Sequence, residues 1–295
     1  MYQSLEELIE DAENAGQPIW KIAADEDARE ENISPEESFQ RMKKMYLAMK
    51  SSDQQYDPTL KSRSGLVGTE ADKITKRKQT NELLTGNFIG SVMERALKIA
   101  ESNACMKRIV AAPTAGSCGV VPAVLLSLQE KLQASDDTMT EALSVAAAIG
   151  GVIASRASLA GAEGGCQAEI GSASGMAAAA AVYLDGGTER QMASAMAIAL
   201  SGMLGLVCDP VAGLVEVPCV KRNVIGAVNA LTSADMALSG IESKIPPDEV
   251  IDAMKSIGHS MAMELRETGK GGLAGTPTGV KIRQAVSGGM HDKNA

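Results

Sequence analysis

Apolar positions recur with a helical period through most of the chain. Near its start, Leu5, Leu8 and Ile9 have the i, i+3, i+4 spacing that places side chains on one face of a helix. A second helix is predicted from Ser34, because Pro35 suits its first position and Glu37 completes a capping box. We interpret its apolar stripe as core or subunit packing, with an interaction face as the alternative. The stripe comprises Phe39, Met42, Met45, Tyr46 and Met49.

Residues 51–80 interrupt this pattern with loop signals such as Asp57-Pro58. Within them, the stretch from Ser62 to Lys73 contains glycines and then charged residues. It could bind an anion through backbone N–H groups and Lys73, and the alternative is a solvated connector. Its glycine spacing fits neither a dinucleotide fingerprint nor a P-loop.

The remainder of the chain is predicted to be a series of helices rich in small residues. Strand signals are few, so the fold class is predicted to be all-α. We expect one compact helical domain over residues 61–295, with residues 1–60 as a helical segment packing on it, and an irregular glycine-rich stretch at 266–279. The expected helices cover about 88–100, 124–132, 138–159 (opened by a Thr138–Glu141 capping box), 173–184, 188–204 (opened by Thr188–Gln191), 224–239 and 246–265.

The composition supports packed helices and disfavours several partners. Hydrophobic residues make up 45% of the 295 residues but aromatic residues only 2%, so Ala, Val, Ile, Leu and Met must form the core. A net charge of -9 disfavours nucleic acid, which is bound by clustered Lys and Arg. The first residues lack the apolar region of a secretory signal, and the least charged run, 191–208, is too short to span a membrane. We therefore expect a cytoplasmic protein with no membrane partner.

Three of the five cysteines lie between residues 166 and 219, each beside Gly, Pro or an acid. Clustered cysteines in a cytosolic protein indicate metal binding or catalysis. A structural zinc site usually has four N/S ligands, and the two histidines, His259 and His291, lie far along the chain. An iron–sulfur cluster held by three thiolates keeps one iron open for Lewis-acid catalysis. A thiol nucleophile assisted by His259 is an alternative, although nothing in the sequence pairs them.

Residues 112–122 form a turn of small residues that leads into a helix N-terminus, where free N–H groups suit a carboxylate or phosphate. An ordinary helix start is the alternative. Two cations just after the last clustered cysteine could hold a substrate carboxylate, and nearby acids could carry protons or act as caps. The acids are Glu163, Glu169, Asp209 and Glu216. The candidate substrate-binding residues are Thr114, Gly116, Ser117, Lys221, Arg222 and Asn223.

Several stretches closely resemble the iron–sulfur-dependent bacterial L-serine dehydratases. They are AAPTAGS at 111–117, GAEGGCQAE at 161–169 and CDPVAGLVEVPCVKRN at 208–223, together with the less specific loops SGLVG at 64–68 and GGLAGTPTG at 271–279. The resemblance implies a [4Fe–4S] cluster held by Cys166, Cys208 and Cys219. It further implies that L-serine binds the open iron and is converted to pyruvate and ammonia without pyridoxal phosphate.

The resemblance also implies a missing partner. Family members have two domains on one chain or two separate chains, and this sequence resembles the alpha, cluster-carrying part. We therefore expect a beta subunit that contributes a histidine motif to the site, in a hetero- or homo-oligomer. On this chain the candidate catalytic residues are Lys73 and Glu163, and Cys118 is not counted as a ligand. Alternatives are a related lyase acting on L-cysteine or L-threonine, an iron–sulfur sensor or electron-transfer subunit, and a helical structural subunit.

Overall fold

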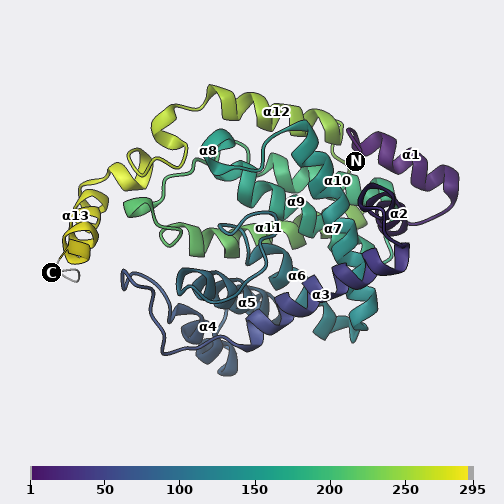
Figure 1. The fold of residues 1–295 in the computed structure, drawn as a ribbon. Coiled ribbons are helices and arrows are strands. Elements are labelled where there is room, and N and C mark those ends of the chain that lie inside the picture. The colour runs from purple at the N-terminus through teal and green to yellow at the C-terminus, as the bar shows by residue number, and fades with distance from the viewer. Residues whose placement is uncertain (1, 292–295) are drawn as a thin grey trace.

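Helices account for nearly all regular structure in the computed structural model, which describes residues 2–291 (Figure 1). No β-strand occurs in that range, where only an isolated bridge pairs Cys208 with Arg266. The predicted all-α class is confirmed. The helices are α1 (Leu5–Ala15), α2 (Ile19–Glu31), α3 (Pro35–Gln54), α4 (Glu70–Gln79), α5 (Gly86–Ala104), α6 (Val120–Leu132), α7 (Asp136–Arg156), α8 (Gly161–Gly164), α9 (Ser172–Leu184), α10 (Glu189–Ser201), α11 (Cys219–Leu238), α12 (Pro247–Ser260) and α13 (Pro277–His291), with short turns η1 (Gln167–Gly171), η2 (Val211–Gly213), η3 (Met263–Leu265) and η4 (Gly272–Gly275).

Helix α9 forms the centre of the core, between α6, α7, α10 and α11 (Figure 1). Its sequence, SASGMAAAAAVYL, is apolar on every side, which is typical of a fully buried helix. Small side chains allow the neighbouring helices to come close. At Gly175, for example, an added Cβ would lie 2.9 Å from Cγ of Met196, so α10 packs on the bare backbone of α9. This packing explains how a chain with so few aromatic residues fills its core.

Helices α2 and α3 pack against α7, whereas α1 packs against α2, α10 and α12, and α3 begins as predicted. The Ser34 side chain accepts a hydrogen bond from the backbone N–H of Glu37 at 3.1 Å, and Pro35 is the first residue of α3. Along the predicted stripe of α3, Tyr46 and Met49 are buried, whereas 49% of Met45 is exposed. Core packing is therefore confirmed for Tyr46 and Met49, whereas Met45 is not a core residue and subunit packing at this position stays a prediction.

Residues 51–80 are not wholly a loop, which corrects the prediction. Helix α3 continues to Gln54, and α4 covers Glu70–Gln79. The buried carboxylate of Glu101 accepts hydrogen bonds from the backbone N–H groups of Glu70 and Ala71, at 2.7 and 3.4 Å, and from the Tyr56 hydroxyl at 2.7 Å. The cap of α4 thus comes from a residue thirty positions away, and local sequence signals could not show it.

Two capping predictions have opposite outcomes. The capping box of Thr188 and Gln191 is present at the start of α10. The predicted box of Thr138 and Glu141 is wrong, because the Ser135 hydroxyl accepts a hydrogen bond from the Thr138 N–H at 3.1 Å and α7 begins at once after Ser135. Two acids in the first turn of α7 favour this earlier start through the helix dipole.

The C-terminal boundaries also differ from the prediction. Helix α11 begins at Cys219 rather than near residue 224, and α12 ends at Ser260. The glycine-rich stretch is irregular only as far as Thr276, whose hydroxyl accepts from the N–H of Gly279 at 3.1 Å. With Pro277 as its first residue, α13 then projects from the body (Figure 1).

Helix α7 is long and apolar enough to cross a membrane if length and composition alone are considered. In the structure, 61% of its most apolar stretch is buried, and the helix packs against α9, α2 and α3. A core helix meets the same criterion, so this feature by itself is weak support for a membrane span.

Replacing Ile153 by alanine tests the packing of α7. Ile153 is completely buried, so Ile153→Ala is expected to lower the free energy of unfolding by about 2–5 kcal/mol through lost burial and a residual cavity. The matched control Ile225→Ala removes a side chain that is 59% exposed and should change stability by no more than about 0.5 kcal/mol. Denaturant titration followed by circular dichroism measures both, and equal losses would contradict the placement of α7.

Candidate metal centre

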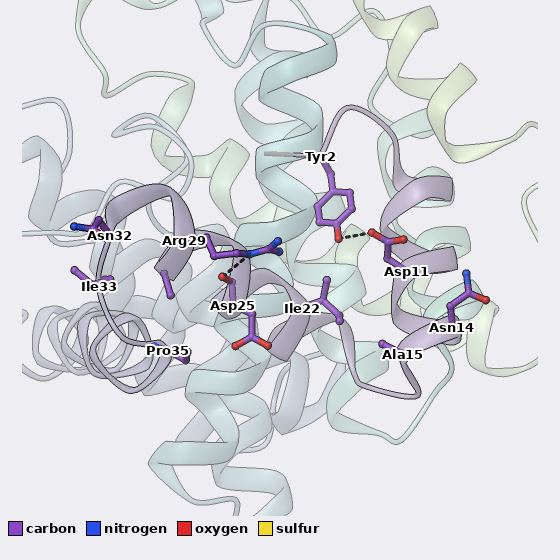
Figure 2. Close-up of a pocket in the computed structure, with 11 residues that line it drawn as sticks. Tyr2, Asp11, Asn14, Ala15, Ile22, Asp25, Arg29, Asn32, Ile33 and Pro35 are labelled. Atoms are coloured by element: carbon purple, nitrogen blue, oxygen red, sulfur yellow. Dashed lines mark hydrogen bonds between the residues drawn. The ribbon is translucent and has the colours of Figure 1, made fainter.

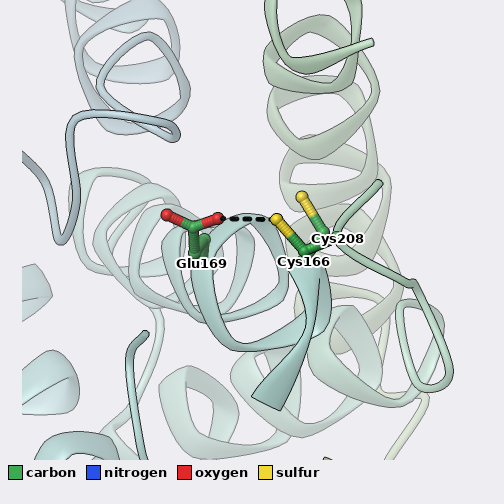
Figure 3. Close-up of side chains that lie close together, drawn as sticks. All are labelled: Cys166, Glu169 and Cys208. Atoms are coloured by element: carbon green, nitrogen blue, oxygen red, sulfur yellow. Dashed lines mark hydrogen bonds between the residues drawn. The ribbon is translucent and has the colours of Figure 1, made fainter. Parts of the chain in front are cut away.

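Two thiols and one carboxylate converge at the start of the central helix. One ligand atom each from Cys166, Glu169 and Cys208 lies within 4.8 Å of the others (Figure 3). The Cys208 thiol donates a hydrogen bond to Oε2 of Glu169 at 3.8 Å. Both cysteines are only 2% exposed, and Glu169 is half-buried. This set of sulfur and oxygen donors could hold a metal ion shielded from solvent.

A single turn of π-helix, η1, brings Glu169 to the same side as Cys166. Such turns are frequent at functional sites because they shift the register of side chains along a helix. The first residue of this turn, Gln167, is completely buried and is bonded at both ends of its amide. Its Nε2 donates to the carbonyl of Met254 at 3.0 Å, and its Oε1 accepts from the N–H of Gly205 at 2.8 Å. Gln167 therefore ties η1 to α12 and to the segment that leads to Cys208.

The third predicted ligand, Cys219, is the first residue of α11 and is also buried. It lies outside the 4.8 Å group, but burial together with the nearby Cys166 and Glu169 raises its pKa to about 12. The neighbouring Cys208 thiol, with help from the charge of Arg222, instead lowers the pKa of Cys166. The neighbouring Cys166 and burial raise the pKa of Cys208. Cys219 thus lies near Cys166 and Glu169 but outside the closest group, and the surroundings favour the thiolate at Cys166.

Arg222 is the cation of this site, and its side chain is only 15% exposed. Its guanidinium donates to the carbonyl of Val207 at 2.8 Å and lies 2.8 Å from Oδ1 of Asp209. The other carboxylate oxygen of Asp209 accepts from the N–H of Leu273 at 2.7 Å. Burial disfavours the charge of Arg222, but Cys166 and Asp209 hold its pKa above the usual value. Arg222 therefore bonds to the residues immediately before and after Cys208.

The predicted turn of small residues closes the site on the side of Glu169. The Thr114 hydroxyl donates to Oε1 of Glu169 at 2.8 Å, and the Ser117 hydroxyl lies 3.1 Å from that of Thr114. A Cβ added to Gly116 would lie 3.0 Å from the same carboxylate oxygen. Burial raises the pKa of Glu169 in spite of the hydrogen bond from Thr114. This carboxyl is thus suited to holding a proton.

Asn223 holds that turn in place. Its side-chain oxygen accepts from the N–H of Gly119 at 2.8 Å, and its Nδ2 donates to the carbonyls of Gly116 and Cys219 at 2.8 and 3.0 Å. Asn223 is only 1% exposed. Its side chain therefore links the turn to the helix that begins at Cys219.

Other residues predicted for the site have different surroundings. Lys73 is exposed on α4, one turn after Glu70. The amine of Lys221 forms an ion pair with the Glu70 carboxylate at 3.2 Å. Glu163 is exposed on α8, on the side that faces α12. Cys118 is buried in the core, where burial raises its pKa to about 12. The roles assigned to Lys73, Glu163 and Lys221 stay predictions.

A larger hollow of about 980 Å³ lies between α1, α2 and the start of α3 (Figure 2). Two hydrogen bonds join its lining residues, because Tyr2 donates to Asp11 at 2.7 Å and Arg29 donates to the carbonyl of Asp25 at 3.2 Å. None of the predicted site residues lines it. The convergence of thiols and carboxylate makes the region around Cys166 the candidate site.

Comparison with known proteins agrees with this choice. A sequence model of the serine dehydratase alpha chain matches residues 14–274. The chain belongs to the serine dehydratase alpha chain family. This confirms the resemblance predicted from the sequence motifs.

Relatives of two sizes are similar to this chain. A probable L-serine dehydratase alpha chain of Bacillus subtilis is 48% identical over 98% of this chain and 96% of its own length. The L-serine dehydratase alpha chain of Peptoniphilus asaccharolyticus is 41% identical over 96% of this chain and 98% of its own length. L-serine dehydratase 1 of Escherichia coli is 44% identical over 64% of this chain, which corresponds to only 42% of that protein.

Replacing Asn223 by alanine tests whether its side-chain hydrogen bonds hold the turn of small residues in place. Asn223→Ala leaves the buried N–H of Gly119 without its partner, which is expected to cost about 1–3 kcal/mol of stability. The control Asn87→Ala alters an exposed asparagine and should be nearly neutral. Denaturant titration of both variants measures the difference, and a neutral Asn223→Ala would show that the turn is held by other contacts.

Proposed function

We propose that this chain is the alpha, cluster-carrying subunit of a cytoplasmic L-serine dehydratase, an ammonia-lyase that converts L-serine to pyruvate and ammonia. The main structural support is the convergence of Cys166 and Cys208 with the half-buried carboxyl of Glu169. The names of the relatives that match nearly the whole chain support the choice of substrate.

In this proposal Cys166, Cys208 and Cys219 hold a [4Fe–4S] cluster. The donor set fits, because the three thiols are buried around one site and thiolates are the usual ligands of such clusters. A cluster also separates its thiolates more widely than a single ion does, which agrees with Cys219 lying outside the closest group. When bound, the cluster supplies an open iron that acts as a Lewis acid toward the substrate hydroxyl.

The residues of the chain itself provide positioning and a proton. Elimination removes the α-hydrogen and the β-hydroxyl of serine as water and leaves aminoacrylate, which tautomerises to an imine and hydrolyses to pyruvate and ammonia. Glu169, whose pKa is raised by burial, is placed to give its proton to the leaving hydroxyl. The turn of Thr114 and Ser117 orients that carboxyl, because the Thr114 hydroxyl bonds to it and lies 3.1 Å from the Ser117 hydroxyl.

The base that removes the α-hydrogen is assigned to a beta subunit. The relative from E. coli is more than twice as long as the region it shares with this chain, which leaves room for such a part. Large apolar side chains are exposed on the segments beside Cys208 and Asp209, with Met263 72% and Leu273 45% exposed. Exposed apolar surface close to a site is typical of an interaction face, so we place the beta subunit there.

Anaerobic reconstitution with the beta subunit tests the activity. L-Serine is expected to yield pyruvate, while L-threonine and L-cysteine yield little 2-oxobutanoate or pyruvate. Cys219→Ser should lose both activity and bound iron and sulfide, whereas the control Cys118→Ser should keep them, because Cys118 is a core residue. If the reconstituted complex forms no pyruvate from serine, the proposed substrate is wrong.

The variant Glu169→Gln separates a proton carrier from a metal ligand. If Glu169 carries a proton, iron and sulfide contents should match those of the wild type, while kcat falls by about 10²–10⁴-fold. The control Glu242→Gln changes an exposed acid and should alter neither quantity. Loss of iron from Glu169→Gln would instead show a centre ligated by Cys166, Glu169 and Cys208 and would overturn the three-thiolate cluster.

A further inference from the structure

A small hollow of about 140 Å³ lies between α8 and the C-terminal half of α12, on the outer side of the segment that carries Cys166. The two helices lie side by side in Figure 1. An added Cβ at Gly258 would come within 2.8 Å of the Gly164 backbone, so α12 packs closely on α8 here. Glu163 lines this hollow, although the sequence motif had suggested a place for it in catalysis.

Groups of opposite charge line the hollow. Lys255 and His259 are four residues apart on α12 and therefore share one face of it, while Glu163 comes from α8. Within residues 2–291, the side chains of Glu163 and His259 make no hydrogen bond or ion pair. The Lys255 amine makes one bond, to the carbonyl of Arg156 at 3.1 Å, and keeps further donors. A ligand could therefore meet a cation on one wall and an anion on the other.

The size of the hollow limits the ligand to a few heavy atoms. Sites for drug-sized ligands usually enclose about 300–1,000 Å³, so nucleotides and peptides are too large. Lys255 and His259 can bind a carboxylate, and Glu163 can bind an ammonium group. We propose that this pocket binds a small zwitterionic α-amino acid.

The pocket is connected to the metal centre through α8, which has only four residues. At the start of this helix, a Cβ added to Gly161 would lie 2.6 Å from the Glu169 carboxylate and 3.0 Å from the Cys208 sulfur. Glu163, two residues later, faces the pocket. The amino acid would thus occupy a second position, distinct from the centre, and its binding does not depend on whether the chain acts on serine.

Limited acetylation of the full-length chain tests this proposal. L-Alanine is the probe, because it is a zwitterion without a hydroxyl group to eliminate. Acetylation of Lys255 by acetic anhydride, measured by mass spectrometry relative to the exposed Lys244, should slow as L-alanine is added. Protection should reach about tenfold when the ligand is about ten times its Kd, as expected for a single site.

Charge variants and partial ligands give the specificity of the effect. Glu163→Gln should abolish protection by L-alanine, whereas Glu249→Gln, which removes an exposed acid from the first turn of α12, should leave it unchanged. Propionate, which lacks the ammonium group, should protect weakly. Equal protection by propionate would show a simple anion site and overturn the proposal, as would identical acetylation with and without L-alanine at its solubility limit. Neither result bears on the formation of pyruvate from serine.

Discussion

A buried guanidinium holds the site together. Arg222 bonds to the carbonyl before Cys208 and to the carboxylate after it, and its charge favours the thiolate of Cys166. Through Asp209 the same contact reaches the backbone of Leu273, and the neighbouring Gly272 has no room for a Cβ, which would lie 2.4 Å from Asp209 Oδ2. Loss of one partner of a buried pair typically costs about 3–5 kcal/mol, so three separate segments depend on one cation.

Much of the fold could be predicted because its signals are local. The starts of α3 and α10 follow from Ser34 and Thr188, whose hydroxyls act on residues three positions away. The start of α4 depends on Glu101, and that of α7 on a serine that competes with Thr138. The start of α4 cannot be predicted without tertiary contacts, and the start of α7 cannot be predicted without the relative energies of two overlapping caps. The many glycines favoured an irregular stretch over α13, although Thr276 followed by Pro277 is a signal for the start of a helix.

The site was predictable in its parts but not in its arrangement. The motifs identified the cysteines and the turn at Thr114, since these occur in runs that are specific to a family. Both Glu163 and Glu169 lie in the same sequence motif, so the sequence could not show which of them reaches the thiols. The π-turn brings Glu169 to the thiols, whereas Glu163 lines the hollow beside α12. Gln167 escaped notice because a buried amide has no sequence signature beyond its place after Cys166.

The charges of the site explain why a metal should complete it. Burial raises the pKa of Glu169. Burial together with the nearby Cys166 and Glu169 raises the pKa of Cys219. The neighbouring Cys166 and burial raise the pKa of Cys208. Arg222 supplies one positive charge, which the Cys166 thiolate shares with the Asp209 carboxylate. Because metals bind thiolates, a metal centre held by these residues would have to displace the protons of the other thiols and balance their charge. Binding therefore releases protons and strengthens as pH rises, for as long as those thiols are protonated in the free chain.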